Sequence, residues 1–554
     1  MLAPLGAAQG PAPTATSPIQ RAYFEKGPTN PAFVIQNATV PLFAAGGGQQ
    51  GLSGSLNSSL LWRHESDGSW IAESASLGNH GTEVFVEYGD FDNRAALLSG
   101  HASNADTPIW QVDQVHLNVR RRVDSSEFTS VHVSAHLLYD EVADTWQTQL
   151  RKFSLGSTVA DWQFDSSIVS LSPEYLDVAV SDDGQRIVLI EWDPAANGSR
   201  VSLFGPDSAV PVAVHAVPSF GGVRRFQLSE DGSTLLLVSN QKVTLVDVAS
   251  GAVVYEDYLF GIAEYFSFAI SGDGAVLGYS KMGSIRTYHR NEVGVYEQGP
   301  VHSPGQGHYA RAMDLSMDGG VLFAGLQKLG NLNAVRFKAI DTATGTVLLD
   351  HELEGSGALS NLIESVECSS DGTRFAAGLW GDADGVAPEV LAFEVGEAGP
   401  ILAEDLPGSV YSISLSPDGR HLAVASKGVH SSVWGGGGAF SLYRVGQPEL
   451  EVDGLPLADT VVQLRQHLRE GLQGRILVAT QLAATPTAAP QYGDGLLYLD
   501  PASVVELPIQ TGATDNFALT PYLLGAAGSE IYLQAVHVDR GQLGRSWIKV
   551  TVAP

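Results

Sequence analysis

An all-β fold built from repeated units is predicted by three features of the sequence: a recurring turn phrase, its spacing, and the apolar runs beside it. The phrase is Ser-x-Asp-Gly, and it begins at Ser181, Ser229, Ser271, Ser316, Ser369 and Ser416. Its glycines are 42 (Gly232 to Gly274) to 53 (Gly319 to Gly372) residues apart. A period of about 40–50 residues, each unit a run of short strands, is typical of a β-propeller.

The stretch 410–426 shows the unit most clearly. Apolar and polar residues alternate in Ile413-Ser-Leu-Ser416 at the end of the first strand-like run, the turn follows, and a second strand-like run ends at Ser426. Elsewhere the runs are apolar throughout, as in Leu235-Leu-Leu-Val238, which is expected of strands buried between stacked sheets. Glycine accepts the positive φ of a tight turn, and serine and aspartate side chains can bind turn amides. We therefore interpret the phrase as structural.

The repeat divides the chain into three parts. Residues 1–20 are rich in Ala, Pro, Gly and Thr and are expected to be a flexible tail, with the remnant of a signal peptide and an ordinary N-terminus as the two alternatives. Residues 21–59 contain a strand-like segment at 32–40, and residues 60–554 form the propeller, with regular repeats at 175–450.

The sequence predicts a single large propeller of about ten four-stranded blades, six of them clear and four inferred from degenerate units. The alternative is seven or eight blades plus an extra β subdomain. Because the last unit lacks a fourth strand, the segment 32–40 is expected to supply it and close the ring.

Composition limits the partners. The chain has 61 acidic and 31 basic residues and a net charge of −30, which disfavours nucleic acid and anionic membrane surfaces. No apolar run is long enough to span a bilayer. The one cysteine, Cys368, excludes an intramolecular disulfide and is expected to be a buried, inert thiol. We expect a monomer.

The repeat phrases Leu415-Ser-Pro-Asp-Gly-Arg-His-Leu-Ala-Val424 and Ala179-Val-Ser-Asp-Asp-Gly-Gln-Arg-Ile-Val188 resemble the WD40-like repeats of bacterial propellers of the TolB and YVTN type. The resemblance covers residues 175–445. It implies the propeller fold and a secreted or periplasmic location, and it leaves function open, because such propellers serve as scaffolds, ligand binders and enzymes.

Candidate ligand-binding residues lie in the irregular loops between second and third strands. In a propeller these loops leave the ring on the face opposite the Asp-Gly turns, and long aromatic and acidic loops on one face are typical of a binding surface. The candidates on this face are Trp146, Trp192, Trp380, His430, Trp434 and Tyr492.

Two of these loops also carry candidate calcium ligands. Asp382, Asp384 and Glu389 belong to the first, and Asp90 and Asp92 to the second. Ca²⁺ takes six to eight oxygen ligands, and closely spaced carboxylates can supply several. The alternative is an ordinary turn in which each carboxylate binds a backbone amide.

His132 and His136 stand four apart in one strand-like segment, on one face of the sheet. We interpret them as structural, since sequence supplies no third ligand.

Three functions are compatible with these features. The leading one is a non-catalytic propeller that binds a protein, peptide or glycan through the irregular loops. The second is a metal-dependent hydrolase or lactonase-like enzyme with an acidic site at the channel mouth. The third is a structural assembly module. An enzyme would require Asp, Glu or His residues from at least three blades to converge on one point.

Overall fold

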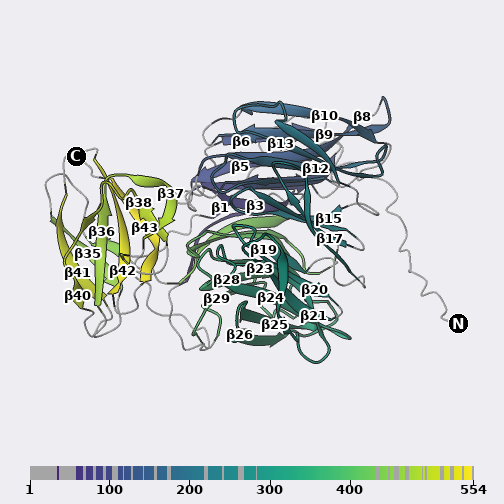
Figure 1. The fold of residues 1–554 in the computed structure, drawn as a ribbon. Coiled ribbons are helices and arrows are strands. Elements are labelled where there is room, and N and C mark those ends of the chain that lie inside the picture. The colour runs from purple at the N-terminus through teal and green to yellow at the C-terminus, as the bar shows by residue number, and fades with distance from the viewer. Residues whose placement is uncertain are drawn as a thin grey trace.

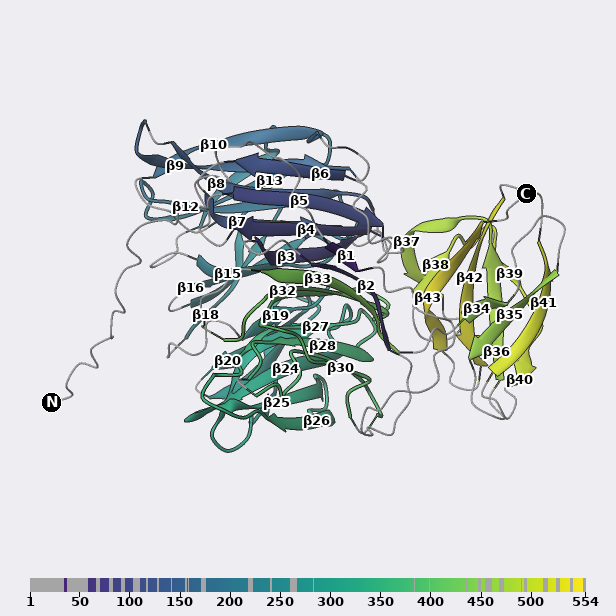
Figure 2. The same cartoon turned by 180° about the vertical axis from the view of Figure 1, so that it is seen from behind.

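The computed structural model describes residues 34–36 and 58–551, apart from short gaps of one to seven residues. All regular elements in these parts are β-strands (Figures 1 and 2). Among the described residues, no helix is long and apolar enough to cross a membrane.

Seven of the sheets contain four antiparallel strands in chain order. Blade 1 comprises β3 (Trp70–Gly78), β4 (Glu83–Asp90), β5 (Ala95–Ala102) and β6 (Trp110–Val115). Blade 2 comprises β7 (Asn118–Ser125), β8 (His132–Asp140), β9 (Thr145–Phe153) and β10 (Trp162–Ser170). Blade 3 comprises β11 (Leu176–Val180), β12 (Ile187–Asp193), β13 (Gly198–Phe204) and β14 (Ala213–Val217). Blade 4 comprises β15 (Val223–Leu228), β16 (Thr234–Ser239), β17 (Lys242–Asp247) and β18 (Val253–Tyr258).

The remaining blades follow the same order. Blade 5 comprises β19 (Phe268–Ile270), β20 (Val276–Lys281), β21 (Ser284–Arg290) and β22 (Tyr296–His302). Blade 6 comprises β23 (His308–Leu315), β24 (Val321–Lys328), β25 (Asn331–Asp341) and β26 (Val347–Glu354). Blade 7 comprises β27 (Ile363–Cys368), β28 (Arg374–Leu379), β29 (Val390–Glu394) and β30 (Leu402–Glu404).

An N-terminal strand completes the eighth blade and closes the ring. The sheet contains β31 (Val410–Leu415), β32 (His421–Lys427) and β33 (Gly438–Arg444), followed by β2 (Ser59–Glu65) and β1 (Val34–Gln36). The fourth strand is therefore β2, and β1, from the segment 32–40, is added outside it as a fifth. The first strands of neighbouring blades contact each other around the ring, and β31 contacts β3.

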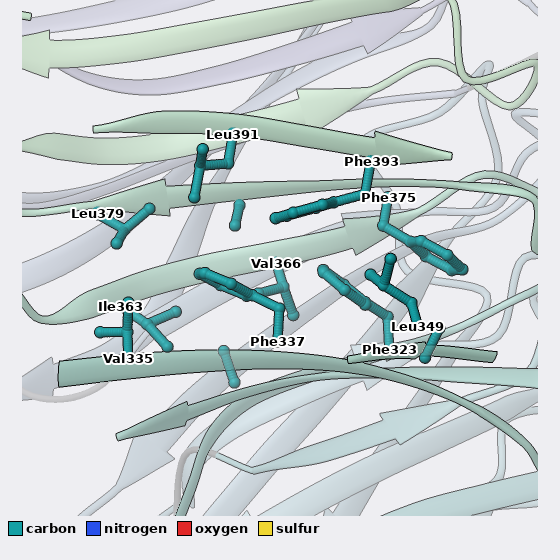
Figure 3. Packing of buried hydrophobic residues seen from close by; sticks show 13 residues of the cluster. Phe323, Val335, Phe337, Leu349, Ile363, Val366, Phe375, Leu379, Leu391 and Phe393 are labelled. Carbon is teal, nitrogen blue, oxygen red and sulfur yellow. The ribbon is translucent and has the colours of Figure 1, made fainter. Parts of the chain in front are cut away.

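A buried apolar cluster lies between each pair of neighbouring blades, including blades 8 and 1. The cluster between blades 6 and 7 is shown in Figure 3, where phenylalanines of both sheets point toward one another. The rings of Phe323 and Phe375 stack with centroids 4.6 Å apart, and those of Phe337 and Phe393 are 5.4 Å apart. Each sheet thus buries its faces only against its neighbours, which explains why the blades form a ring.

The turn phrase has one geometry throughout. At Ser369 the hydroxyl donates to Asp371 Oδ1 (2.8 Å), the Thr373 amide donates to the same oxygen (3.0 Å), and the Arg374 amide donates to Ser369 Oγ (3.0 Å). Gly372 has a φ of 65°. The same serine–aspartate bond recurs in the turns at Ser181, Ser229, Ser271, Ser316 and Ser416. The phrase therefore has a structural role, as its chemistry predicts.

Replacing Gly372 with alanine is expected to lower the free energy of unfolding by about 2 kcal/mol or more, because left-handed backbone alone costs an L-residue about 1–2 kcal/mol. The added Cβ would also lie 2.9 Å from Val321 Cγ2. Chemical denaturation measures the loss. Gly399→Ala is the matched control, since nothing lies within 4 Å of its added Cβ. Equal losses in both variants would contradict the account of the turn.

The C-terminal strands form sheets of their own. One sheet contains β34 (Leu450–Asp453), β35 (Val461–His467) and β41 (Phe517–Leu523); another contains β36 (Gln473–Ala479), β39 (Val505–Glu506), β40 (Gln510–Thr511), β42 (Glu530–His537) and β43 (Gln542–Thr551). The strands β37 (Leu482–Ala488) and β38 (Leu496–Leu499) form a pair. In both views this yellow group stands apart from the propeller (Figures 1 and 2).

The propeller prediction is confirmed, but the count of about ten blades is not. Eight sheets form the ring, and the two expected C-terminal blades are replaced by the separate sheets of residues 450–551. The physical reason is that β2 takes the fourth position of blade 8 beside β33, and the faces of blades 8 and 1 pack on each other, which leaves no gap in the ring for a further blade. The alternative of seven or eight blades plus a β subdomain describes the fold.

Candidate functional site

The ring has two faces. The face with the Ser-x-Asp-Gly turns between first and second strands is called the turn face. The opposite face, with the loops between second and third strands and the linkers between blades, is called the loop face. The first strand of each blade starts at the loop face and ends at the turn face.

Near the loop face, the first strands of several blades contain one extra residue. In blades 4, 6, 7 and 8 it stands five positions before the turn serine, at Arg224, Arg311, Glu364 and Tyr411. Blade 1 has a similar bulge at Glu73. Such bulges redirect a side chain and are frequent beside functional sites.

The bulges of blades 7 and 8 contribute to a group of side chains called the mouth cluster: Glu364, Trp380, Tyr411 and Lys427. The Trp380 indole donates from Nε1 to Glu364 Oε2 (2.9 Å). Lys427 Nζ lies 6.0 Å from the ring centre of Trp380 and 5.6 Å from that of Tyr411. The Tyr411 side chain remains 36% exposed, so the cluster presents an aromatic surface to solvent.

The lysine ammonium is held inside the cluster. Lys427 Nζ donates to the carbonyl oxygen of Ser431 and to that of Val433 (3.3 Å). Burial lowers the pKa of Lys427, and it raises the pKa of Tyr411, with the charges of Glu73 and Glu364 acting in the same direction. Because it binds two carbonyls and lies over aromatic rings, Lys427 fixes the loop that follows β32.

Glu389 and His430 lie in the same region, between the loops of blades 7 and 8. The Leu406 amide donates to Glu389 Oε2 (2.5 Å), and His430 Nε2 lies 2.9 Å from the Leu406 carbonyl and 3.4 Å from Glu389 Oε1. A carbonyl oxygen only accepts, so His430 carries a hydrogen on Nε2. Burial raises the pKa of Glu389 to about 8, and the charge of Asp405 adds to the effect.

The carboxylates of the first calcium candidate bind protein groups. Asp382 is fully buried and accepts the Ser356 amide (2.6 Å) and the Val386 amide (2.9 Å). Asp384 accepts the Ser356 hydroxyl (2.6 Å). Within the described ranges, no group of three or more His, Cys, Asp or Glu residues is placed to hold a metal ion. The Asx-turn interpretation of Asp382 fits these bonds, and the calcium assignment stays a prediction.

The second calcium candidate lies outside the described structure, since Asp92 and the side chain of Asp90 are not described.

The predicted aromatic residues lie at several separate places. Trp146 packs beside Tyr139 (ring centres 4.8 Å apart) against the core between blades 2 and 3. Trp192 lies at the loop-face end of β12 in blade 3. Tyr492 packs against the C-terminal sheets, and Trp434 lies outside the described residues. Of the predicted ligand-binding residues, the structure brings together Trp380 and His430, beside Glu389.

Near the turn face, polar side chains of the first strands bind the next blade. Each stands two positions before the residue that begins the turn, and each accepts a backbone amide of the following blade. The bonds are Val180 N to Asp124 Oδ2 (2.8 Å), Ile270 N to Gln227 Oε1 (3.3 Å), Cys368 N to Asp314 Oδ2 (2.8 Å), Leu415 N to Glu367 Oε2 (2.6 Å) and Leu77 N to Ser414 Oγ (3.0 Å). These side chains join neighbouring blades beside the central axis.

The carboxyl groups in this layer have raised pKa values, chiefly because burial disfavours their charge. The pKa is raised to about 7 for Asp124 and to about 6 for Asp314, and it is well above its usual value for Glu367. The nearby Glu230 has its pKa raised to about 8 by burial and by the charge of Asp314. Burial also raises the pKa of the partly buried Cys368 well above its usual value, which fits an inert thiol.

A buried Ser–His–Glu arrangement joins blades 1 and 2. His132 Nδ1 lies 2.8 Å from Ser125 Oγ, and His132 Nε2 lies 3.0 Å from Glu83 Oε2. Exposure is 5% for Ser125, 0% for His132 and 6% for Glu83, so no substrate reaches them. His136, on the same face of β8, pairs with Glu87 (3.5 Å). The structural interpretation of both histidines agrees with this arrangement.

Sequence reasoning missed Glu364, Tyr411 and Lys427. A signal was present: residues five positions before the turn serine depart from the strand alternation, with Glu364 and Tyr411 at equivalent positions. The extra residue of a bulge can be recognised only when the pairing of its strand with the neighbouring strand is known, and the sequence does not give that pairing.

Replacing Trp380 with phenylalanine is expected to lower the free energy of unfolding by about 1–2 kcal/mol, because it removes a hydrogen bond to a charged group. Urea denaturation measures the change. Trp192→Phe, at the equivalent end of the second strand in blade 3, is the control, because the described parts show no side-chain hydrogen bond for Trp192. A Trp380 variant as stable as the control would contradict the assigned bond.

No family model matches the chain, and neither does any curated protein. Among solved structures the chain is similar to the β-propeller domain of Cps50 (Swd1) from Myceliophteria thermophila, with 10% identity, 58% of this chain and 96% of that chain covered, and a TM-score of 0.40. The sheet order itself defines the class: the chain forms a β-propeller, followed by separate C-terminal β-sheets, and its likeness to WD40-like repeats stays a prediction. Membership of the bacterial TolB or YVTN type stays a prediction.

Proposed function

We propose that the chain is a non-catalytic, exported scaffold whose loop face binds a protein, peptide or glycan. The observation that supports this function best is the mouth cluster, where Glu364 and Tyr411 of two bulged first strands lie beside Trp380 and Lys427 at the ends of the second strands. A propeller that presents a partly exposed aromatic residue at one face suits the recognition of a large ligand. A propeller fold agrees with a scaffold or binding role.

The test uses peptide and glycan arrays probed with the full chain. We expect saturable binding to one class of array member and at least a tenfold loss of affinity in Tyr411→Ala, because exposed aromatic residues commonly dominate such contacts. The control is Tyr258→Ala, since Tyr258 is a 59% exposed tyrosine on the outer strand of blade 4. The proposal would be contradicted if the chain bound neither the peptide array nor the glycan array, or if Tyr411→Ala and Tyr258→Ala lost affinity equally.

The hydrolase or lactonase-like alternative lacks a supporting observation. It requires carboxylate or histidine ligands from at least three blades at one point, and the described parts of the chain contain no such group. The carboxylates that do line several blades, Asp124, Asp314 and Glu367, accept backbone amides of the next blade.

A further inference from the structure

In blades 1 to 7 the fourth strand lies at the outer edge of its sheet and is called the outer strand. The outer strand of blade 3, β14, and the residues just before it carry no charged side chain, unlike the other outer strands. Residues 208–217, Ser-Ala-Val-Pro-Val-Ala-Val-His-Ala-Val, contain no Asp, Glu, Lys or Arg, although the chain has a net charge of −30. Within this segment Val210 is 71% exposed, Val212 68% and Val214 53%. Val214 belongs to the edge strand β14, and Val210 and Val212 stand just before it, so the exposed valines form an apolar row along and before this edge.

The outer strands of blades 4, 5 and 6 are protected in two ways. Each contains carboxylates: β18 includes Glu256 and Asp257, β22 includes Glu297, and β26 includes Asp350 and Glu352. Each also has a register shift against its inner neighbour. Charges and bulges on an edge strand prevent it from pairing with another strand. By contrast, β14 pairs with β13 from Ser199↔Val217 to Leu203↔Ala213 without a shift.

The molecule itself shows that an outer edge can take a further strand. In blade 8, β1 adds to the edge of β2 in antiparallel register, with Val34 opposite Glu65 and Gln36 opposite Arg63. The corresponding edge of blade 3 has no added strand among the described residues.

We propose that β14 pairs with β14 of a second copy of this chain, so that two blade 3 sheets join into one antiparallel sheet about a two-fold axis. Paired about Ala213, Val212 of each copy lies opposite Val214 of the other, and Pro211, which has no amide hydrogen to donate, lies opposite His215 at each end of the pairing. Cross-strand pairs of β-branched residues stabilise antiparallel sheets. His215 does not interfere, because its Nε2 lies 3.2 Å from the Val248 carbonyl of blade 4.

The absence of local charge favours self-pairing at β14 over self-pairing at the outer strands of blades 4 and 6. Self-pairing of β18 or β26 would bring carboxylates of two strongly acidic molecules together, whereas self-pairing of β14 brings together uncharged residues. The long-range repulsion between two chains of charge −30 remains, and salt screens it. Dimerisation through β14 therefore strengthens as salt is added, whereas binding of a basic partner would weaken. This surface lies at the outer rim and is independent of the loop face, and it departs from the monomer expected from sequence.

Sedimentation velocity of the full chain tests the proposal, over a range of protein and salt concentrations. The wild type is expected to show a monomer–dimer equilibrium that shifts toward dimer with added sodium chloride. The double variant Val212→Lys, Val214→Lys is expected to raise the dimer dissociation constant by about tenfold or more. The matched control, Val293→Lys with Val295→Lys, adds the same charge at exposed valines of blade 5 and is expected to retain the dimer.

Circular dichroism confirms that each variant is folded, and Val214→Asp serves as a second edge variant if the double lysine variant is not. A wild type that stays monomeric at all concentrations, a dimer that persists in the edge variants, or a control that loses the dimer equally would overturn the proposal. A monomer that binds a basic or an apolar peptide at β14 would overturn it as well, because the occupant would then be a different molecule.

Discussion

Replacing Phe375 with alanine is expected to lower the free energy of unfolding by about 3–5 kcal/mol, the usual cost of removing a buried aromatic ring. Phe375 is fully buried, and its ring stacks on Phe323 of the preceding blade at 4.6 Å (Figure 3). The cavity would lie between two sheets that hold each other by apolar contact, so neither sheet can collapse into it without losing other contacts.

Guanidinium chloride denaturation followed by tryptophan fluorescence measures this loss. Val386→Ala is the control, since Val386 is 60% exposed and surface substitutions usually change stability by no more than about 0.5 kcal/mol. A loss below about 1 kcal/mol for Phe375→Ala would show that the blades are not held by the cluster between them.

The buried carboxyl groups near the turn face are expected to make the protein less stable as pH rises from about 4 to about 8. Their pKa values are raised in the folded state, to about 7 for Asp124 and about 6 for Asp314, so the folded state holds protons that the unfolded chain releases. This stabilisation is complete below the ordinary carboxyl pKa of about 4 and is lost as pH rises through the folded values. The melting temperature is therefore expected to fall across this interval.

Substituting asparagine for Asp124 tests the cause. The amide oxygen of Asn can still accept the Val180 amide, while the ionisable group is removed. At pH 8 we expect the free energy of unfolding of Asp124→Asn to exceed that of the wild type by at least about 2 kcal/mol, because each pKa unit of difference between the folded and unfolded states corresponds to about 1.4 kcal/mol. At pH 4, where Asp124 is protonated in the folded wild type, the two proteins should have nearly the same free energy of unfolding.

The control for the pH series is Asp207→Asn, at an exposed carboxylate. It is expected to follow the wild-type pH dependence. A melting temperature that rises between pH 4 and pH 8, or an Asp124 variant with unchanged pH dependence, would contradict the assignment.

The propeller class could be predicted from the sequence because one turn, repeated with the same residues, needs local information only. Ser369 and Asp371 form the hydrogen bonds of their own turn, and Gly372 adopts its positive φ. The five other turns are built in the same way. The number of blades could not be predicted in this way. The number of blades depends on which strand closes the ring. The closing strands β2 and β33 are neighbours in space, but the residues of all the other blades lie between them in the sequence.

The C-terminal strands misled the count for a related reason. Segments such as Arg475-Ile-Leu-Val-Ala and Glu530-Ile-Tyr-Leu have the apolar pattern of propeller strands. In the structure they pair with each other, as β36 and β42, in a sheet outside the ring. Pattern alone does not distinguish a blade strand from any other buried strand, and these segments lack the Ser-x-Asp-Gly turn.

The candidate site could be predicted in part. Trp380, His430 and Glu389 were recognisable because they stand in irregular loops, and the topology brings those loops together between blades 7 and 8. Lys427 lies at a strand end and had no local signal, and Glu364 was signalled only by its position five residues before the turn serine. Their roles depend on contacts with the aromatic rings of Trp380 and Tyr411, which only the packed structure reveals.

The account rests on an eight-bladed ring closed by β2, and a disulfide between β2 and β33 tests it most directly. Arg63 and Ser441 lie directly opposite each other in this strand pair, where Cα atoms are about 4.5–5.5 Å apart, a spacing that a disulfide can bridge. In a Cys368→Ser background, oxidation of the variant with Arg63→Cys and Ser441→Cys is expected to form this bond nearly completely in the folded protein, as seen by non-reducing electrophoresis and peptide mapping. A folded variant whose two thiols stay free would contradict the account, because further blades would then separate β33 from β2.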